Sequence, residues 1–480
     1  MQKLNAVFLC LLTAWTLTAQ KHDNNWIFGI SAQPFNNPNG VLMHFEQGYP
    51  TFSVENIRQY YGPYCAVCSD SSGNLIFHTN GRSIRNKKHQ IMENGDTINP
   101  GAVWQEYQFG YPSVTGGFAL PAPGLSNRYY LIHTSLNNGN LPTPICPILY
   151  YTLIEVNPDE DGSVISKNNI LAEGDIPSPV AIKHGNGRDW WVIAGDYLNH
   201  KYQTFLIDPD GVHFMFDQAL TPGAFASSSG YHEVSPDGRY FVNNDDVSVL
   251  WIYDFDRCSG LLSHPRLLPY QPPVFWTATN VFSPDSRFLY VGTHLVVYQL
   301  DMKTIDEPVI AFDTIARYEY GASPAPPAYT HFYQPALAPD TKIYYATFSE
   351  TDAYHVINRP KLPLLASNFD QRGLIIPKKR DLTWCHFPAY RLGRWSDSPC
   401  DTLPFAGQIE DSFNHIPWRP ATIPAEKEAL SIHIMHLPPS FHVPDNVPKE
   451  PADNPMSPIR MLEHERFIQK QKLKEYDHKE

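Results

Sequence analysis

Apolar and polar positions alternate along residues 25–395, and helical periodicity is nearly absent there. The clearest strands follow a recurring turn, which appears as Ser235-Pro-Asp-Gly, Ser283-Pro-Asp-Ser and Ala338-Pro-Asp-Thr. Proline presets φ for the second position of such a turn, aspartate caps the turn through its carboxylate, and glycine tolerates a positive φ. The period of two that follows each turn predicts a half-buried strand.

The turns are spaced as the blades of a β-propeller would be. Ser235 and Ser283 are 48 positions apart, and Ser283 and Ala338 are 55 positions apart, close to the roughly 40–50 residues of one blade. The sequence therefore predicts an all-β fold, a β-propeller of seven or eight blades over residues 21–395, with seven favoured. Two separate β-sandwiches are the alternative, but they leave the recurrent Pro-Asp turn unexplained.

Both ends of the chain depart from this pattern. Residues 1–20 combine Lys3, an apolar run and small residues before Gln20, which predicts a secretory signal peptide. Residues 396–457 are rich in proline and predict a linker with one isolated strand, and residues 458–480 predict a charged helix or a partly disordered tail. No later segment is apolar over about 18 residues, so no transmembrane span is expected.

Composition narrows the class of protein. The chain has 480 residues, with Lys+Arg 36 against Asp+Glu 49 and a net charge of −13. A nucleic-acid partner is not expected, because binding to phosphate needs clustered Lys and Arg. Only 18% of the residues are charged and 13% are aromatic, so the chain can bury a core and is not a disordered acidic protein.

Six cysteines remain after the predicted signal peptide, and an even number in an exported chain is compatible with disulfides in fifteen connectivities. Cys385 and Cys400 are close enough in sequence to bridge a local loop, whereas Cys65 and Cys68 can pair with each other or with distant partners. A zinc site would need a second tight pair, and a redox motif would need a βαβ context. We therefore expect structural cysteines at these positions: Cys65, Cys68, Cys146, Cys258, Cys385 and Cys400.

Several ordered motifs resemble a known group of proteins over about residues 24–403. They include Asn24-Asn-Trp-Ile-Phe-Gly, Lys183-His-Gly-Asn-Gly-Arg-Asp-Trp-Trp and Phe255-Asp-Arg-Cys-Ser-Gly. The group consists of exported Bacteroidota surface proteins with an N-terminal WD40/YVTN-like β-propeller, usually followed by PKD modules and a type IX secretion sorting domain. The resemblance implies a secreted or outer-surface location. It offers no activity that can be transferred to named residues.

The chain departs from the group in its C-terminal part. A PKD module should begin near residues 430–437, yet no Trp-Asp-Phe-Gly-Asp-Gly motif follows, so only a truncated PKD-like strand is expected there. No recognisable sorting domain is present. Export is therefore expected, and attachment by the type IX route is left open.

One loop and one strand offer candidate ligand-binding residues. Paired glycines at 185 and 187 predict a tight turn, and the polar and aromatic residues around it suit stacking on a carbohydrate or peptide. In the structural alternative, which we favour, Arg188 and Asp189 form an internal ion pair and the tryptophans fill the space between blades. The candidates are His184, Asn186, Arg188, Asp189 and Trp191, together with His78 and Asn80 on the strand at residues 75–81.

Motifs of known catalytic and metal sites are missing. The sequence has no Gly-x-Ser-x-Gly elbow, no His-Glu-x-x-His and no glycine-rich phosphate loop, so no catalytic residue and no metal ligand is assigned. Acidic turns at residues 157–162 and 243–246 offer oxygens to Ca²⁺, but ordinary turns are favoured over Ca²⁺ sites there. No other cofactor is expected.

The sequence thus favours an exported β-propeller without catalytic activity, which binds a glycan, a protein or a cell-surface component through loops at one end of its channel. An enzyme is the less favoured expectation: a hydrolase or lyase with its active site in the channel. A structural spacer of a surface assembly is the third alternative. The ligand and the oligomeric state are left open.

Overall fold

The structure is a computed structural model that describes residues 20–401, except 29–38, 47–48, 62–63, 109, 114–116, 138–144, 157–160, 220–230, 245–248, 270–278, 320–329, 348–350 and 381–383. The predicted signal peptide, apart from Gln20, lies outside the described residues. The predicted isolated strand and charged tail lie outside them as well, and so does the predicted linker beyond Asp401. In the described part of the chain, no helix is long and apolar enough to cross a membrane.

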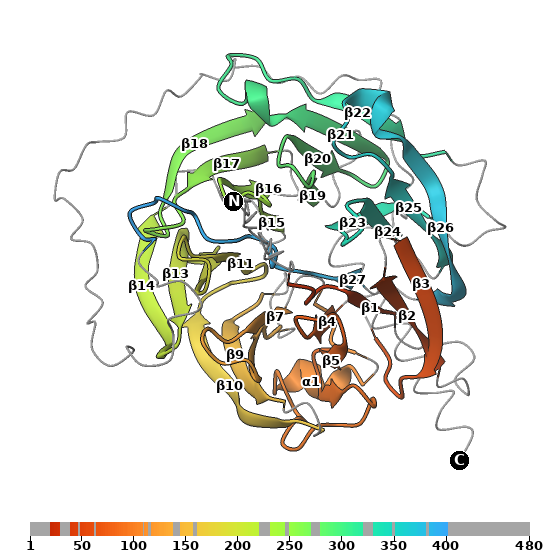
Figure 1. The fold of residues 1–480 in the computed structure, drawn as a ribbon, viewed down its shortest axis with the longest axis vertical. Coiled ribbons are helices and arrows are strands. Elements are labelled where there is room, and N and C mark those ends of the chain that lie inside the picture. Colours follow the sequence, from red (N-terminus) through yellow and green to blue (C-terminus); the bar gives the residue numbers. More distant parts are fainter. Residues whose placement is uncertain are drawn as a thin grey trace, which may run out of the picture.

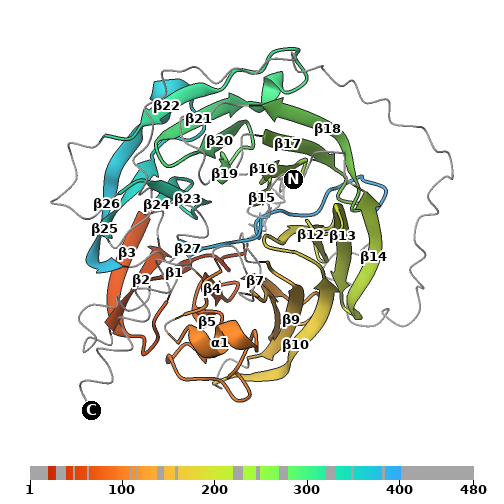
Figure 2. The same ribbon diagram turned by 180° about the vertical axis from the view of Figure 1, so that it is seen from behind.

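Seven sheets surround a central axis, which confirms the predicted seven-bladed all-β propeller (Figures 1 and 2). The first sheet contains β1 (Asn25–Phe28), β2 (Asn39–Glu46) and β3 (Tyr49–Asn56), and the second contains β4 (Tyr64–Ser69), β5 (Leu75–Thr79) and β6 (Ile84–Asn86). The third contains β7 (Gly117–Pro121), β8 (Arg128–Thr134), β9 (Ile148–Glu155) and β10 (Ser163–Glu173). A short helix, α1 (Ala102–Glu106), lies between the second and third.

The next four sheets have four strands each, in sequence order from the channel outward. The fourth sheet contains β11 (Val180–Lys183), β12 (Trp190–Asp196), β13 (Lys201–Asp208) and β14 (Gly211–Ala219), and the fifth contains β15 (Tyr231–Val234), β16 (Tyr240–Asn244), β17 (Val249–Phe255) and β18 (Leu262–Pro269). The sixth sheet contains β19 (Thr279–Phe282), β20 (Phe288–Gly292), β21 (Val296–Asp301) and β22 (Asp313–Arg317). The seventh contains β23 (Phe332–Leu337), β24 (Ile343–Thr347), β25 (Thr351–Ile357) and β26 (Phe369–Arg380). Two 3₁₀ turns, Met302–Thr304 and Leu364–Ser367, connect strands.

Each Pro-Asp turn is followed by a strand, as predicted, and the structure shows that the turn joins the innermost strand of a blade to this next strand. At the first of them, Asp237 Oδ1 accepts hydrogen bonds from Ser235 Oγ at 2.6 Å and from the backbone N–H of Arg239 at 3.1 Å. Gly238 has a φ of 76°, and Ser286 takes the same position in the next turn with a φ of 59°. The carboxylate therefore caps the turn even where glycine is absent.

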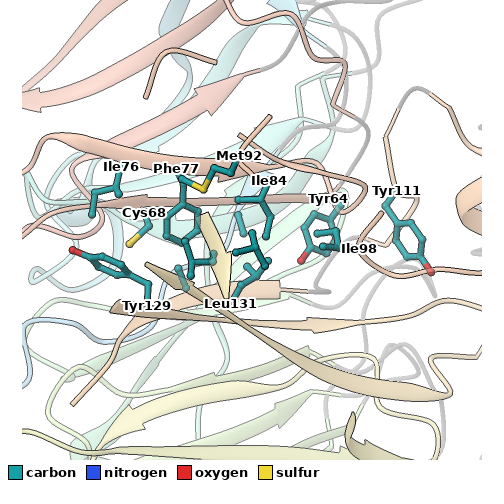
Figure 3. Close-up of a cluster of buried hydrophobic side chains, with 14 of the residues drawn as sticks. Tyr64, Cys68, Ile76, Phe77, Ile84, Met92, Ile98, Tyr111, Tyr129 and Leu131 are labelled. Atoms are coloured by element: carbon teal, nitrogen blue, oxygen red, sulfur yellow. The ribbon is translucent and has the colours of Figure 1, made fainter. Parts of the chain in front are cut away.

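Neighbouring blades pack face to face through apolar side chains. Figure 3 shows one such cluster, in which Phe77 of β5 lies against Tyr129 and Leu131 of β8. The Phe77 and Tyr129 rings meet edge to face with centroids 5.9 Å apart, a favoured aromatic arrangement. The first and last blades pack in the same way, through Trp26 and Tyr344, so the ring closes.

A segment from the C-terminal side of the propeller crosses the channel. We call residues 384–401 the strap. It begins with β27 (Trp384–Cys385), which pairs in parallel with β4, and then crosses the centre of the ring towards β11 (blue in Figures 1 and 2). Tyr390 Oη donates to Ala119 O at 2.6 Å, and the backbone N–H of Trp395 donates to Gly185 O at 2.8 Å.

A disulfide holds the far end of the strap. Cys400 is bonded to Cys258, so the predicted local bridge between Cys385 and Cys400 is wrong. The strap carries Cys400 away from Cys385 and across the ring. The remaining described cysteines, Cys65, Cys68, Cys146 and Cys385, are buried and unbonded in the structure.

Candidate functional site

A cavity lies on the channel axis, where the innermost strands of several blades converge. It has about 370 Å³ of empty space, counted together with its opening to solvent. Its walls come from the segment before β11, from β15, β19 and β23, and from the start of the strap. The lining residues are Ser178, Tyr231, His232, Glu233, Thr279, Asn280, Gln334, Pro335, Trp384 and His386.

Glu233 places a carboxyl group in this cavity. It lies on β15 between the buried residues His232 and Val234, and no described residue forms an ion pair with it. Burial raises the pKa of Glu233 to about 8, and a backbone hydrogen bond at Val234 opposes this only weakly. With a pKa above 7, the carboxyl favours its protonated form at neutral pH, since no lysine or arginine among the described lining residues stabilises the charged form.

Two histidines beside the cavity are held neutral. Burial lowers the pKa of His232 to about 4 and that of His386 to about 4. His232 Nδ1 donates to Ser178 O at 2.6 Å, so its Nε2 accepts from Tyr197 Oη at 3.3 Å. Both nitrogens of His232 are thus occupied within the protein. His386 lies on the strap, and its ring packs 6.1 Å from that of Phe118.

Two lining side chains hold polar atoms without partners among the described residues. Both the Nδ2 and the Oδ1 of Asn280 are buried and make no hydrogen bond there, and neither does the Nε1 of Trp384. Asn280 is 5% exposed and Trp384 is also 5% exposed. Leaving buried polar groups unpaired costs about 1–3 kcal/mol each, and both residues line the cavity.

A hydrogen bond spans the channel between two blades. Gln334 Nε2 on β23 donates to Tyr231 Oη on β15 at 3.4 Å, and the blade containing β19 lies between them in the ring. No lysine or arginine is among the described residues that line the cavity. The site therefore combines a neutral carboxylic acid, a neutral imidazole and amide groups, and it carries no positive charge from these residues.

The predicted ligand-binding loop lies elsewhere. Ser178 lines the cavity before β11, whereas the loop follows β11, so the loop lies at the other end of that strand. Arg188 Nε donates to Asp189 Oδ1 at 2.6 Å, and Asn186 Nδ2 donates to Asp189 Oδ2 at 2.6 Å. This is the internal ion pair of the structural alternative.

The aromatic members of the loop pack inside the protein. The ring of His184 lies 5.3 Å from that of Trp191, and burial lowers the pKa of His184. The indole N–H of Trp191 donates to Arg257 O at 2.8 Å, and Trp190 and Trp191 are each 1% exposed. The tryptophans fill the space between blades, and ligand binding by this loop stays a prediction.

His78 and Asn80 also use their polar atoms within the protein. Tyr61 Oη bonds to His78 Nδ1, and His78 Nε2 lies 2.9 Å from His89 Nδ1. Asn80 Nδ2 donates to Tyr60 O at 2.8 Å. Neither residue lines the channel cavity. Much of the two acidic turns that offer oxygens to Ca²⁺, at residues 157–160 and 245–246, lies outside the described residues.

The cavity residues were missed by the sequence analysis, although the repeat contained a signal. Tyr231, Thr279 and Gln334 each stand four positions before the first residue of a Pro-Asp turn, and all three line the cavity. The turn marks the end of the innermost strand, so residues just before it face the channel. No comparable signal marks Trp384 and His386, because the fold alone brings the strap to the channel.

Comparison with known proteins gives structural likenesses at low sequence identity. No protein-family model and no curated protein matches the chain. Among solved structures, a candidate 6-phosphogluconolactonase of Bacteroides uniformis is 11% identical, with 75% of this chain and 97% of that chain covered and a TM-score of 0.45. One from Bacteroides fragilis is 12% identical, with 75% and 96% covered and a TM-score of 0.46. A periplasmic gluconolactonase of Pseudomonas aeruginosa is 12% identical, with 74% and 97% covered and a TM-score of 0.42.

These names correct one expectation of the sequence analysis. The sequence analysis expected a protein without catalytic activity, and the lactonase names of three similar solved structures contradict that expectation. The propeller part of the family resemblance is supported by the seven sheets of the structure rather than by these likenesses. At 11–12% identity they show the fold alone, and the chemistry has to be argued from the residues of this chain.

Proposed function

We propose that the protein is a hydrolase whose active site is the channel cavity and whose substrate is a small, uncharged ester or lactone. The observation that carries the proposal is the Glu233 carboxyl group, which faces a polar cavity without a cationic partner among the described residues. A carboxylic acid kept neutral in this way is a proton donor rather than a structural ion.

The cavity residues suit the steps of ester hydrolysis. Neutral His386 accepts a proton from the attacking water, and protonated Glu233 donates one to the oxygen of the leaving group. The unpaired N–H groups of Asn280 and Trp384 are donors for the negative charge that develops on the carbonyl oxygen. A general acid with a pKa of about 8 is well matched to work near neutral pH.

The charge of the lining supports an uncharged substrate. Recognition of a phosphate group ordinarily uses arginine, lysine or a helix N-terminus. The described lining contains no lysine or arginine, and the sequence segments 220–230, 270–278 and 320–329, which precede the three innermost strands β15, β19 and β23, contain none either. We therefore propose a neutral substrate and not its phosphorylated counterpart.

Export is part of the proposal. The signal-like residues 1–20 support it, and so does the disulfide between Cys258 and Cys400, since disulfides persist mainly in oxidising compartments. The PKD-like strand and attachment at the outer surface are implied only by the family resemblance and are proposed on that ground.

Hydrolysis of defined compounds tests the proposed activity. Proton release is measured at constant pH with D-glucono-δ-lactone, 6-phosphogluconolactone and p-nitrophenyl acetate, each against the uncatalysed rate. We expect turnover of the uncharged compounds and little of the phosphorylated one. Glu233→Gln should lower the rate by a factor of about 10²–10⁴, while Glu307→Gln, at an exposed glutamate, should leave it unchanged.

Two results would contradict the proposal. In the first, a folded wild-type protein binds these compounds but never exceeds the uncatalysed rate. In the second, Glu233→Gln is as active as the wild type at every pH. Thermal unfolding of both variants shows whether a lost rate reflects a lost fold.

A further inference from the structure

The strap makes a second cysteine contact at the end opposite its disulfide. Cys385 on β27 is the register partner of Cys65 on β4, because these two strands pair in parallel. Both residues are buried, with 4% of Cys65 and 3% of Cys385 exposed. The fold has therefore brought together two thiols from opposite ends of the propeller sequence.

Both thiols point to the same place. Cys65 Sγ lies 3.7 Å and Cys385 Sγ 3.9 Å from the backbone oxygen of Ile27, so the two thiols share one acceptor. Paired strands lie about 4.8 Å apart, which is within the separation of roughly 4.4–6.8 Å that Cα atoms have across a disulfide. The spacing of the paired strands is therefore compatible with a bond between the two sulfurs.

We propose that Cys65 and Cys385 form a second disulfide in the mature protein, so that the strap is cross-linked to the ring at both ends. The Cys258–Cys400 bond shows that the fold already includes one oxidised pair. A compartment that oxidises that pair also favours oxidation of a second pair of thiols that the fold brings together. This inference rests on the geometry of β27 and β4 and is independent of the proposed enzymatic activity.

The cross-link forms by thiol–disulfide exchange with an oxidant disulfide. One cysteine thiolate attacks the oxidant and expels one of its sulfurs as a thiolate, which leaves a mixed disulfide. The second cysteine thiolate then attacks the protein sulfur of that mixed disulfide and expels the other oxidant sulfur. The two expelled thiolates take up the two protons released by Cys65 and Cys385, so two thiols and one disulfide become one disulfide and two thiols.

Because both thiols are buried in the folded protein, we expect this reaction to occur before the strap is fully packed. Desolvation raises the pKa of the Cys65 thiol, and the contact with Cys385 raises it further, so the reactive thiolate is disfavoured in the folded state. An oxidant also cannot reach sulfurs that are only 3–4% exposed. Exchange is therefore expected during folding, and the packed strap then protects the bond.

The cross-link would have two structural consequences. It would enclose the six sheets from β4–β6 to β23–β26 in one covalent loop, with only β1–β3 outside it. It would also fix the backbone of Cys385 between Trp384 and His386, which both line the channel cavity. The position of these two side chains would then depend on a covalent anchor and on one short β-pairing.

Peptide mapping tests the proposal. The full chain is refolded with oxidised and reduced glutathione, denatured without reductant, alkylated with N-ethylmaleimide and digested. We expect a peptide containing Cys65 linked to a peptide containing Cys385, and alkylation of Cys68 and Cys146. The Cys258–Cys400 link is the internal control for oxidation.

The proposal is overturned if Cys65 and Cys385 are both alkylated in a sample that contains the Cys258–Cys400 link, or if either is bonded to another cysteine. Cys385→Ser should leave Cys65 open to alkylation and lose the linked peptide, whereas Cys146→Ser should retain it. The wild-type map decides the question even where Cys385→Ser fails to fold.

Discussion

Arg391 and Asp23 form a bidentate ion pair between the strap and the first described residues of the chain. Arg391 Nη2 donates to Asp23 Oδ1 at 2.6 Å, and Nη1 contacts the other carboxylate oxygen. The Asp23 side chain is 5% exposed, whereas that of Arg391 is 37% exposed. Burial raises the pKa of Asp23, and Arg391 opposes this shift. The strap thus places a positive charge beside a carboxylate that is buried in the fold.

Removing the arginine alone should be costly, because the buried carboxylate is then left unpaired. We expect Arg391→Ala to lower the free energy of unfolding by about 2–4 kcal/mol, less than for a fully buried pair because Arg391 is partly exposed. Urea denaturation measures the effect. Adding Asp23→Asn should restore part of the stability, and Lys88→Ala, in the exposed pair with Asp161, should cost less than about 1 kcal/mol. Equal losses of unfolding free energy in Arg391→Ala and Lys88→Ala would contradict this account.

The disulfide at the far end of the strap should contribute to stability. Cys258 and Cys400 are 142 positions apart, and loss of a cross-link of this length is expected to cost about 2–5 kcal/mol. Replacing both cysteines with serine should therefore lower the midpoint of urea denaturation. A double variant with an unchanged midpoint would show that the contacts of Tyr390 and Arg391 hold the strap without covalent help.

Gly187 tests how tightly the strap packs on the ring. Its φ is 76°, and a Cβ at this position would lie 2.7 Å from the backbone nitrogen of Arg394. Gly124 has nearly the same φ, 73°, but its Cβ would meet nothing closer than 3.5 Å. We expect Gly187→Ala to destabilise the fold by about 1–3 kcal/mol more than Gly124→Ala. Thermal unfolding of the two variants separates the clash from the backbone strain, and equal losses would exclude a packed strap.

The buried histidines predict how stability depends on pH. Burial lowers the pKa of His133, His294 and His355 to about 3 and that of His331 to about 4. The unfolded chain binds protons at these groups below their ordinary pKa of 6.5, but the folded chain does not, so stability is full above pH 6.5 and is lost as the pH falls. Each group contributes up to about 1.4 kcal/mol per pH unit in that range.

Chemical denaturation between pH 4 and 7.5 measures this slope. The raised pKa values of Asp23 and Glu233 act in the opposite sense, since the folded chain holds those protons more tightly. His133→Gln should make the pH dependence shallower, while His264→Gln, at a side chain that is 75% exposed, should not. A stability that is flat between pH 4 and 6.5 would contradict the neutral burial of these histidines.

The architecture could be predicted from the sequence because the residues that specify each turn and each strand are neighbours in the chain. A turn such as Ser235-Pro-Asp-Gly specifies its own geometry, alternation specifies the strand after it, and the spacing of the three turns indicates the size of one blade. The burial of the tryptophans at 190 and 191 agrees with the structural alternative favoured from the sequence, since a blade must fill the space to its neighbour.

The site was not predictable in the same way. Glu233 is one of 49 acidic residues, and its raised pKa arises from surroundings supplied by several blades and the strap. The partner of Cys400 depends on where the strap crosses the ring, and so does the meeting of Cys65 with Cys385. Contacts between segments that are distant in sequence determine these features, and a single sequence carries no local signal for them.

The central claim is that the channel holds a neutral carboxylic acid at Glu233. Nuclear magnetic resonance of protein labelled with ¹³C at the glutamate carboxyl carbon follows each side chain through a pH titration. We predict one resonance that titrates near pH 8, that is missing in Glu233→Gln and present in Glu307→Gln. If every glutamate instead titrates around the ordinary value of 4.5, the channel does not hold a protonated acid, and the proposed active site is wrong.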